Sequence, residues 1–118
     1  MSWAGQIDIQ RNYTYLSRDV HMLTHEQIVN AVAKAATQFP LKTVSYFGSY
    51  ANGNATEQSD LDVIVEFTDD DLISLLDVIA LKYNLEDELS IKVDVLHAPL
   101  PEKAQKRLKI RKTVLVYG

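Results

Sequence analysis

The chain has 118 residues, a formal net charge of −4, and 47% hydrophobic against 24% charged residues. This balance predicts one folded domain, since single cores typically span about 100–150 residues, and it excludes a second catalytic domain within the chain. The absence of Cys excludes disulfides, a thiolate zinc cluster and a Cys nucleophile, and the lack of any apolar run of about 18 residues favours a cytoplasmic protein that does not enter a membrane.

The first 21 residues follow no clean helical period, so we divide the chain into an N-terminal arm, 1–21, and a domain, 22–118. One interpretation of the arm is a set of added residues ahead of an internal start at Met22. No functional prediction depends on the arm.

A capping box of Thr24 and Gln27 predicts the start of a helix of about 14 residues, which Pro40 ends. A β-branched and aromatic run over 43–47 then predicts a strand, and the small polar segment 50–59 predicts a turn. The helix is expected to bury the apolar residues Ile28, Val29, Val32, Ala33, Ala36 and Phe39.

Alternation of apolar and polar residues over 61–67 predicts a second strand, with Asp60, Asp62 and Glu66 on its polar face. The acidic run 69–71 predicts the start of another helix, because negative charge is favoured at a helix N-terminus. This helix is expected to bury a stripe made of Leu72, Leu75, Leu76, Ile79, Ala80 and Tyr83.

The last third of the chain predicts a strand over 91–96, a helix that Pro101 opens and that ends near Lys112, and a short strand over 114–117. The order of elements is that of an α/β (α+β) domain. We therefore expect a mixed β-sheet with helices mainly on one face.

Three aspartates in these strands predict a metal site. Asp60 and Asp62 are two residues apart on a strand, so their carboxylates share a face, and two such anions are costly unless a cation lies between them. Mg²⁺ is the expected cation, because it prefers carboxylate, phosphate and water oxygens. Asp94, at mid-strand, would complete a site for two ions. Upstream, Gly48 and Ser49 form a turn that suits a phosphate group.

The segment Gly48-Ser49-Tyr50-Ala51-Asn52-Gly53, followed by Ser59-Asp60-Leu61-Asp62-Val63-Ile64-Val65, resembles the core motif of the minimal nucleotidyltransferases of the DNA polymerase β-like superfamily. The motif covers 48–65, and the wider resemblance covers most of 24–118. Its spacing is similar to that of the antitoxins of HEPN/MNT toxin–antitoxin pairs. Family members often have a basic residue at the position of Asn52, which implies a weaker hold on the triphosphate here.

This resemblance implies a single-domain nucleotidyltransferase fold and an enzyme that transfers AMP from ATP to a hydroxyl group, a tyrosine, of a toxin. By matched position, Asp60, Asp62 and Asp94 are the implied catalytic and metal-binding residues for two Mg²⁺ ions, and Gly48 and Ser49 the nucleotide-binding residues. The implied partner is a HEPN-type toxin encoded by a neighbouring gene, with the chain acting as a type VII-like antitoxin, alone or as an oligomer.

Two other functions remain open on these residues. The chain could be a non-catalytic antitoxin that neutralises a HEPN toxin by binding, or an enzyme that modifies a small molecule such as an antibiotic. The segment from Pro101 onward carries a net charge of +5 (six basic residues and one acidic), so the remainder carries −9. This basic segment would dock an acidic toxin surface or steer the nucleotide, whereas the acidic remainder argues against direct nucleic-acid binding.

Overall fold

The computed structural model describes residues 22–118, and the predicted arm over 1–21 lies outside the described residues. In chain order the elements are α1 (His25–Ala35), β1 (Leu41–Phe47), α2 (Ser49–Asn52), β2 (Leu61–Phe67), the 3₁₀ turn η1 (Asp70–Leu72), α3 (Leu75–Leu89), β3 (Val93–His97), α4 (Glu102–Arg107) and β4 (Val114–Tyr117). This order confirms the predicted alternation, with α2 as an addition.

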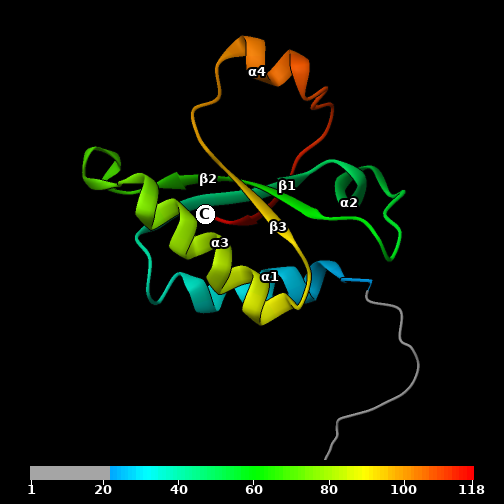
Figure 1. Cartoon of the computed structure of the whole chain (residues 1–118), viewed down its shortest axis with the longest axis horizontal. Coiled ribbons are helices and arrows are strands. Elements are labelled where there is room, and N and C mark those ends of the chain that lie inside the picture. The colour runs from blue at the N-terminus through cyan, green and yellow to red at the C-terminus, as the bar shows by residue number, and fades with distance from the viewer. Residues whose placement is uncertain (1–21) are drawn as a thin grey trace, which may run out of the picture.

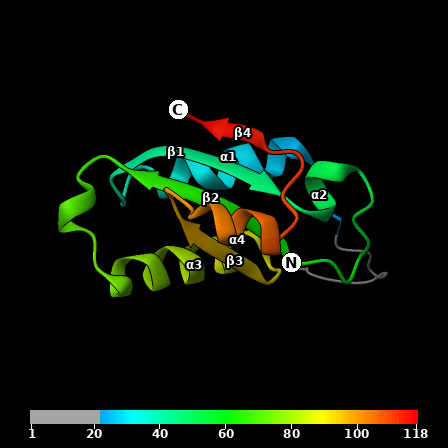
Figure 2. The ribbon, with the colours of Figure 1, turned by 90° about the horizontal axis from the view of Figure 1, so that it is seen from above.

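The four strands form one mixed sheet in the order β3-β2-β1-β4, in which β1 is antiparallel to β2 and β4 while β2 and β3 are parallel. Helices α1 and α3 cover one face of the sheet, and α4 lies over the other (Figure 1). Seen from above, α4 crosses the region of β2 and β3 (Figure 2). The fold class expected from the sequence is therefore confirmed.

Strand β2 carries the core of the domain on one face. Its residues alternate between buried and half-buried side chains along the whole strand, as the sequence predicts. The buried face packs under α1 and α3, and the other face turns toward α4. The largest fully buried side chains of the domain are Ile28, Leu61, Leu81, Leu85, Val32, Val44, Val63, Val65 and Val93.

Helix α1 begins as predicted but ends early. The Thr24 side chain accepts from the Gln27 backbone N–H and the Gln27 side chain accepts from the Thr24 N–H, which confirms the capping box. The helix runs for 11 residues, and turns fill the gap before Pro40. Its buried residues are Ile28, Ala31, Val32 and Ala35, so the expected burial of Ala33 was wrong.

The buried stripe predicted for α3 was also wrong. Ser74 and Asp77 form a second capping box, so the helix starts after the acidic run and not within it. The helix buries Leu81, Leu85 and Leu89. All six residues expected inside are exposed: Leu72 by 79%, Leu75 by 74%, Leu76 by 75%, Ile79 by 37%, Tyr83 by 57%, and Ala80.

Two short elements also differ from expectation. The predicted turn after Gly48 contains the single-turn helix α2, bounded by Gly48 and Gly53, both with positive φ. Helix α4 stops well before Lys112, and Lys109 just beyond it adopts a left-handed φ of 53°. Among residues 22–118, none of the helices combines the length and the apolarity that crossing a bilayer would require.

Candidate active site

The pairing of β2 with β3 brings two of the predicted acids together. In the parallel register, Asp62 lies directly opposite Asp94, on the face of the sheet away from α1 and α3. Neighbouring strands lie about 4.7–4.9 Å apart, so the two carboxylates share one small region. Two unrelated stretches of sequence thus meet at one point.

Gly48 lies against Asp62 on the β1 side of strand β2, opposite Asp94. Phe47, the last residue of β1, pairs with Asp62, so the next residue begins its turn above that carboxylate. A Cβ built on Gly48 would lie 2.6 Å from Asp62 Oδ2, and φ at Gly48 is +74°. Glycine is required here both by the backbone conformation and by the space that the carboxylate occupies.

A pocket of about 500 Å³ opens at this place, and Gly48, Asp62 and Asp94 line it. The other lining residues come from β1, β3, α3 and the end of α4, and they are Phe47, Lys82, Val95, Leu96 and Leu108. The pocket therefore combines apolar walls with two carboxylates and one ammonium group.

The remaining predicted residues do not line this pocket but lie within two residues of ones that do. Asp60 precedes β2 and is exposed, because the strand begins at Leu61, whose N–H donates to the Lys92 carbonyl at 3.0 Å. Its charge still contributes to the raised pKa of Asp62. Ser49 is the first residue of α2 and is half-buried. Thus the structure brings Gly48, Asp62 and Asp94 into one pocket and leaves Asp60 and Ser49 outside its lining.

Within the range 22–118, no three His, Cys, Asp or Glu side chains form a preassembled metal-binding group. Repulsion among three carboxylates disfavours their convergence without a cation. A pair of carboxylates is sufficient for Mg²⁺, which binds one or two of them together with phosphate oxygens and water. The oxygen donors of Asp62 and Asp94 fit that requirement.

The pocket disfavours the negative charge of Asp62. Burial, together with the negative charges of Asp94 and Asp60 and a hydrogen bond with Asp94, raises the pKa of Asp62 to about 6. A carboxylate that is protonated at so high a pH has little stabilisation of its negative charge from the protein itself. A cation bound beside Asp62 would supply that stabilisation.

This raised pKa predicts how the stability of the metal-free protein depends on pH. Because the folded state holds the Asp62 proton more tightly than the unfolded state, stability is lost as pH rises from 3.8 toward about 6. After a discount for solvent screening we expect about 1 kcal/mol, or ~4–8 °C in Tm. Thermal melts in EDTA should show this loss in the wild type relative to Asp62→Asn. Parallel pH profiles for the two proteins would contradict the prediction.

Lys82 and Glu86, which the sequence reasoning missed, hold the residue that precedes Asp94. Lys82 Nζ donates to the Val93 carbonyl at 2.8 Å, and the Val93 N–H donates to Glu86 Oε2 at 2.9 Å. The two side chains are joined by a 2.7 Å ion pair, and this contact raises the pKa of Lys82 and lowers that of Glu86. Together they fix both backbone polar groups of Val93. The sequence signal that could have found this pair is its i,i+4 spacing on a helix, next to the row of buried leucines.

We expect Glu86→Gln to weaken this arrangement. The neutral amide cannot form the ion pair, so the start of β3 and the Asp94 carboxylate are held less firmly. The rate of the reaction at this site should fall by roughly 10-fold, as for other supporting contacts of metal ligands. The matched control is Glu88→Gln. Glu88 is on α3, like Glu86, but its 2.8 Å ion pair is with Lys34 of α1, away from the candidate active site. Equal rates for the two variants would contradict the role of Glu86.

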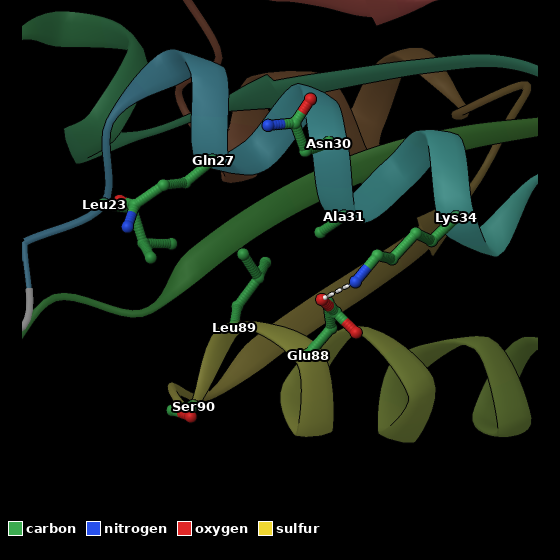
Figure 3. Close-up of a pocket in the computed structure, with 8 residues that line it drawn as sticks. All are labelled: Leu23, Gln27, Asn30, Ala31, Lys34, Glu88, Leu89 and Ser90. Atoms are coloured by element: carbon green, nitrogen blue, oxygen red, sulfur yellow. Dashed lines mark hydrogen bonds and ion pairs between the residues drawn. The ribbon is translucent and has the colours of Figure 1, made fainter. Parts of the chain in front are cut away.

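A larger pocket of about 600 Å³ lies elsewhere, between α1 and the C-terminal end of α3. Lys34 and Glu88 meet across it, with the Leu89 and Ala31 side chains on its walls (Figure 3). The predicted site residues do not line it. The pocket at Asp62 and Asp94 is therefore the candidate active site.

Comparison with known proteins shows the family of this chain. A family model described as "Nucleotidyltransferase domain" matches residues 26–118. The Methanocaldococcus jannaschii protein MJ0435, which is named as a protein adenylyltransferase, is 50% identical to this chain over 56 residues. The match covers 48% of this chain and 58% of MJ0435, so it spans less than two thirds of that relative. The protein adenylyltransferase MntA of Thermococcus cleftensis is 35% identical over 98 residues, covering 80% of this chain and 92% of that protein.

A solved structure shares the fold. It is the complex of a tri-AMPylated Shewanella oneidensis HEPN toxin with an MNT antitoxin. The matched chain of this complex has a TM-score of 0.58 and 20% identity, and the match covers 80% of the present chain and 73% of the matched one. The family model spans nearly all of the described residues, and the MntA relative is covered almost from end to end. The chain therefore belongs to the nucleotidyltransferase domain family.

Proposed function

We propose that the protein transfers AMP from ATP to a hydroxyl group of a HEPN-type toxin and so acts as a type VII-like antitoxin. The observation that carries this proposal is the register of β2 and β3, which sets Asp62 against Asp94 in a pocket closed by Gly48. The adenylyltransferase relatives and the AMPylated toxin complex support the choice of reaction and of partner.

Magnesium fits this pocket because the donor atoms that Asp62 and Asp94 offer are carboxylate oxygens. Asp62 and Asp94 would hold the ions, with Asp60 contributing from its place just before β2. When bound, Mg²⁺ would neutralise negative charge on the phosphate oxygens of ATP. Gly48 and Ser49 would lie along the β- and γ-phosphates of ATP. Because Gly48 has no side chain, it leaves room for the triphosphate beside Asp62.

The residues of the chain would then position the reaction. Asp94 would accept the proton of the attacking hydroxyl, whose oxygen forms a bond to the α-phosphorus as the bond to the β-phosphate oxygen breaks and pyrophosphate leaves. Such a transfer depends on orientation and charge stabilisation rather than on a covalent enzyme intermediate. Phe47, Val95 and Leu108 give the pocket apolar walls.

The basic segment after Pro101 supports the nucleotide as substrate. Helix α4 lies on the same face of the sheet as Asp62, and Leu108 at its end lines the pocket. Lys106 and Arg107 are in its last turn. This positive charge would attract a polyanion such as ATP to a site that is itself acidic.

Transfer of label tests the proposal. The protein is incubated with Mg²⁺, the HEPN-type protein encoded beside it, and ATP radiolabelled at either the α- or the γ-phosphate. We expect the α-label on the HEPN protein and no γ-label, because pyrophosphate leaves. Transfer of the γ-label, or of neither label, would contradict adenylyl transfer.

Neutralisation in cells separates catalysis from simple binding. If transfer is required, Asp62→Asn should fail to protect cells that express the toxin, whereas a binding antitoxin would still protect them. Transfer to an aminoglycoside in the same labelling assay, with none to the HEPN protein, would favour modification of a small molecule.

A further inference from the structure

The exposed face of α3 is a second surface of the domain with an unusual composition. Four large apolar side chains lie along it, and a fifth lies in η1 just before the helix; we call the five together the α3 stripe. Each is at least 37% exposed, and three are at least 74% exposed. Single exposed apolar residues are common, but a contiguous row marks a surface that another molecule covers. The α3 stripe consists of Leu72, Leu75, Leu76, Ile79 and Tyr83.

The spacing of the α3 stripe suits a helix as its occupant. Leu75, Ile79 and Tyr83 follow each other at intervals of four residues, and Leu76 lies beside this row, three residues before Ile79. Leu72 lies in η1, just before the helix begins. Helices pack against such rows through an apolar face of their own with the same period. The buried row of α3, formed by Leu81, Leu85 and Leu89, lies on a different side of the helix, so the stripe is not part of the domain core.

One end of the α3 stripe, at Tyr83, lies near the active site. Lys82, which lines the pocket with Asp62 and Asp94, directly precedes Tyr83, and its Nζ lies 5.7 Å from the centre of the Tyr83 ring. Lys82 also donates to the Val93 carbonyl, beside Asp94. A protein seated on the stripe would therefore have its surface next to the pocket where a hydroxyl group must enter.

Acidic residues border the α3 stripe. Asp69 and Asp71 are exposed at its N-terminal end, Asp87 is exposed one turn beyond Tyr83, and Lys82 is neutralised by its pair with Glu86. A second copy of the chain would bring these like charges together. The segment 1–21 carries two basic and two acidic residues, so it has no excess of positive charge. The complementary occupant is a helix with Lys or Arg on either side of its apolar row.

We infer that the α3 stripe is the docking surface for the protein that receives AMP, and that it engages a helix with an apolar face flanked by basic residues. This inference depends on the proposed function, because it names the binding surface of the same acceptor. It separates two tasks on the chain: the pocket performs the transfer, and α3 selects the protein to be modified.

The test compares two variants that both add exposed charge. Leu72→Glu/Leu76→Glu changes two of the most exposed residues of the stripe, so the fold should be retained. Leu115→Glu changes a 56% exposed residue of β4, at the opposite edge of the sheet from β3. Calorimetry measures the affinity of each for the HEPN-type protein, and the transfer assay gives KM and kcat.

We expect the double variant to bind the HEPN protein roughly 10–100-fold more weakly, as when central apolar anchors of an interface are lost. Its KM for that protein should rise by a similar factor, with kcat at saturation, nucleotide binding and Tm unchanged. Leu115→Glu should behave as the wild type.

Other outcomes separate this inference from the proposed function. Wild-type affinity and KM in the double variant would overturn the inference while AMP transfer stands. If the wild type binds the HEPN protein through the stripe but transfers no AMP, docking is supported and the proposed reaction fails. If light scattering shows that the double variant only splits a homodimer, the stripe is a self-interface and the inference is wrong. A wild type that neither binds nor modifies the HEPN protein overturns both.

Discussion

Asp62→Asn is expected to reduce the rate of AMP transfer by roughly 10³-fold, the equivalent of about 4 kcal/mol of lost charge stabilisation. The amide keeps the shape of the side chain but removes the negative charge that faces Asp94 across the strands. Because burial and like charges already raise the pKa of Asp62, removal of the charge should not destabilise the metal-free fold. The loss of rate would therefore be a loss of chemistry and not of structure.

The matched control for this variant is Glu66→Gln. Glu66 lies on the same face of β2, farther along the strand, and accepts a hydrogen bond from Thr43 Oγ1 at 2.9 Å. Glutamine can still accept that bond, so the rate should remain near the wild-type value. A similar loss of rate in both variants would show that any charge on this face matters, and would contradict a specific role for Asp62.

Gly48→Ala is the second change with a large expected effect. Its Cβ would lie 2.6 Å from Asp62 Oδ2, so the carboxylate must move. A misplacement of about 1 Å at a reacting centre can reduce a rate by roughly 100-fold. The positive φ of +74° adds a backbone cost of about 1–2 kcal/mol, which should lower Tm as well.

Gly53→Ala separates the two causes. Gly53 has a similar φ of +80°, but its Cβ would meet no atom within 4 Å. It should lower Tm to a similar extent and leave kcat nearly unchanged. If both variants lose activity equally, the effect belongs to strain in the segment around α2 and not to displacement of Asp62.

Local patterns predicted the elements that position the site. Strand β2 has the predicted bounds because strict alternation reveals both its extent and its two faces. The capping box of Thr24 and Gln27 likewise identified the start of α1. The proximity of Asp62 and Asp94 follows from a parallel register that no local pattern encodes. The expectation of it came from the unusual mid-strand position of Asp94 and from the family resemblance.

The orientation of α3 could not be predicted from periodicity. This helix has two apolar rows, one with Ile79 and Tyr83 and another with Leu81 and Leu85, and either could face a core. Contacts with α1 and β3 decide which row is buried. The misassigned row is the surface to which we now assign partner binding, so the ambiguity in the sequence reflects two separate contact surfaces.

Long-range contacts also account for the residues that were missed. Lys82 and Glu86 hold Val93 from a neighbouring element, and a single-turn helix such as α2 is too short to show a period. Asp60 was expected on the strand and instead lies just before it, because the ladder begins at Leu61. None of these features follows from a local period in the sequence.

The intact mass of the HEPN-type protein, measured after incubation with ATP, Mg²⁺ and this chain, tests the central claim most directly. We predict a mass increase of whole adenylate units, placed on a hydroxyl side chain by fragmentation, with no increase when Asp62→Asn replaces the wild type. An unchanged mass with the wild-type chain, or the same increase with Asp62→Asn, would contradict the assignment of this pocket as the centre of AMP transfer.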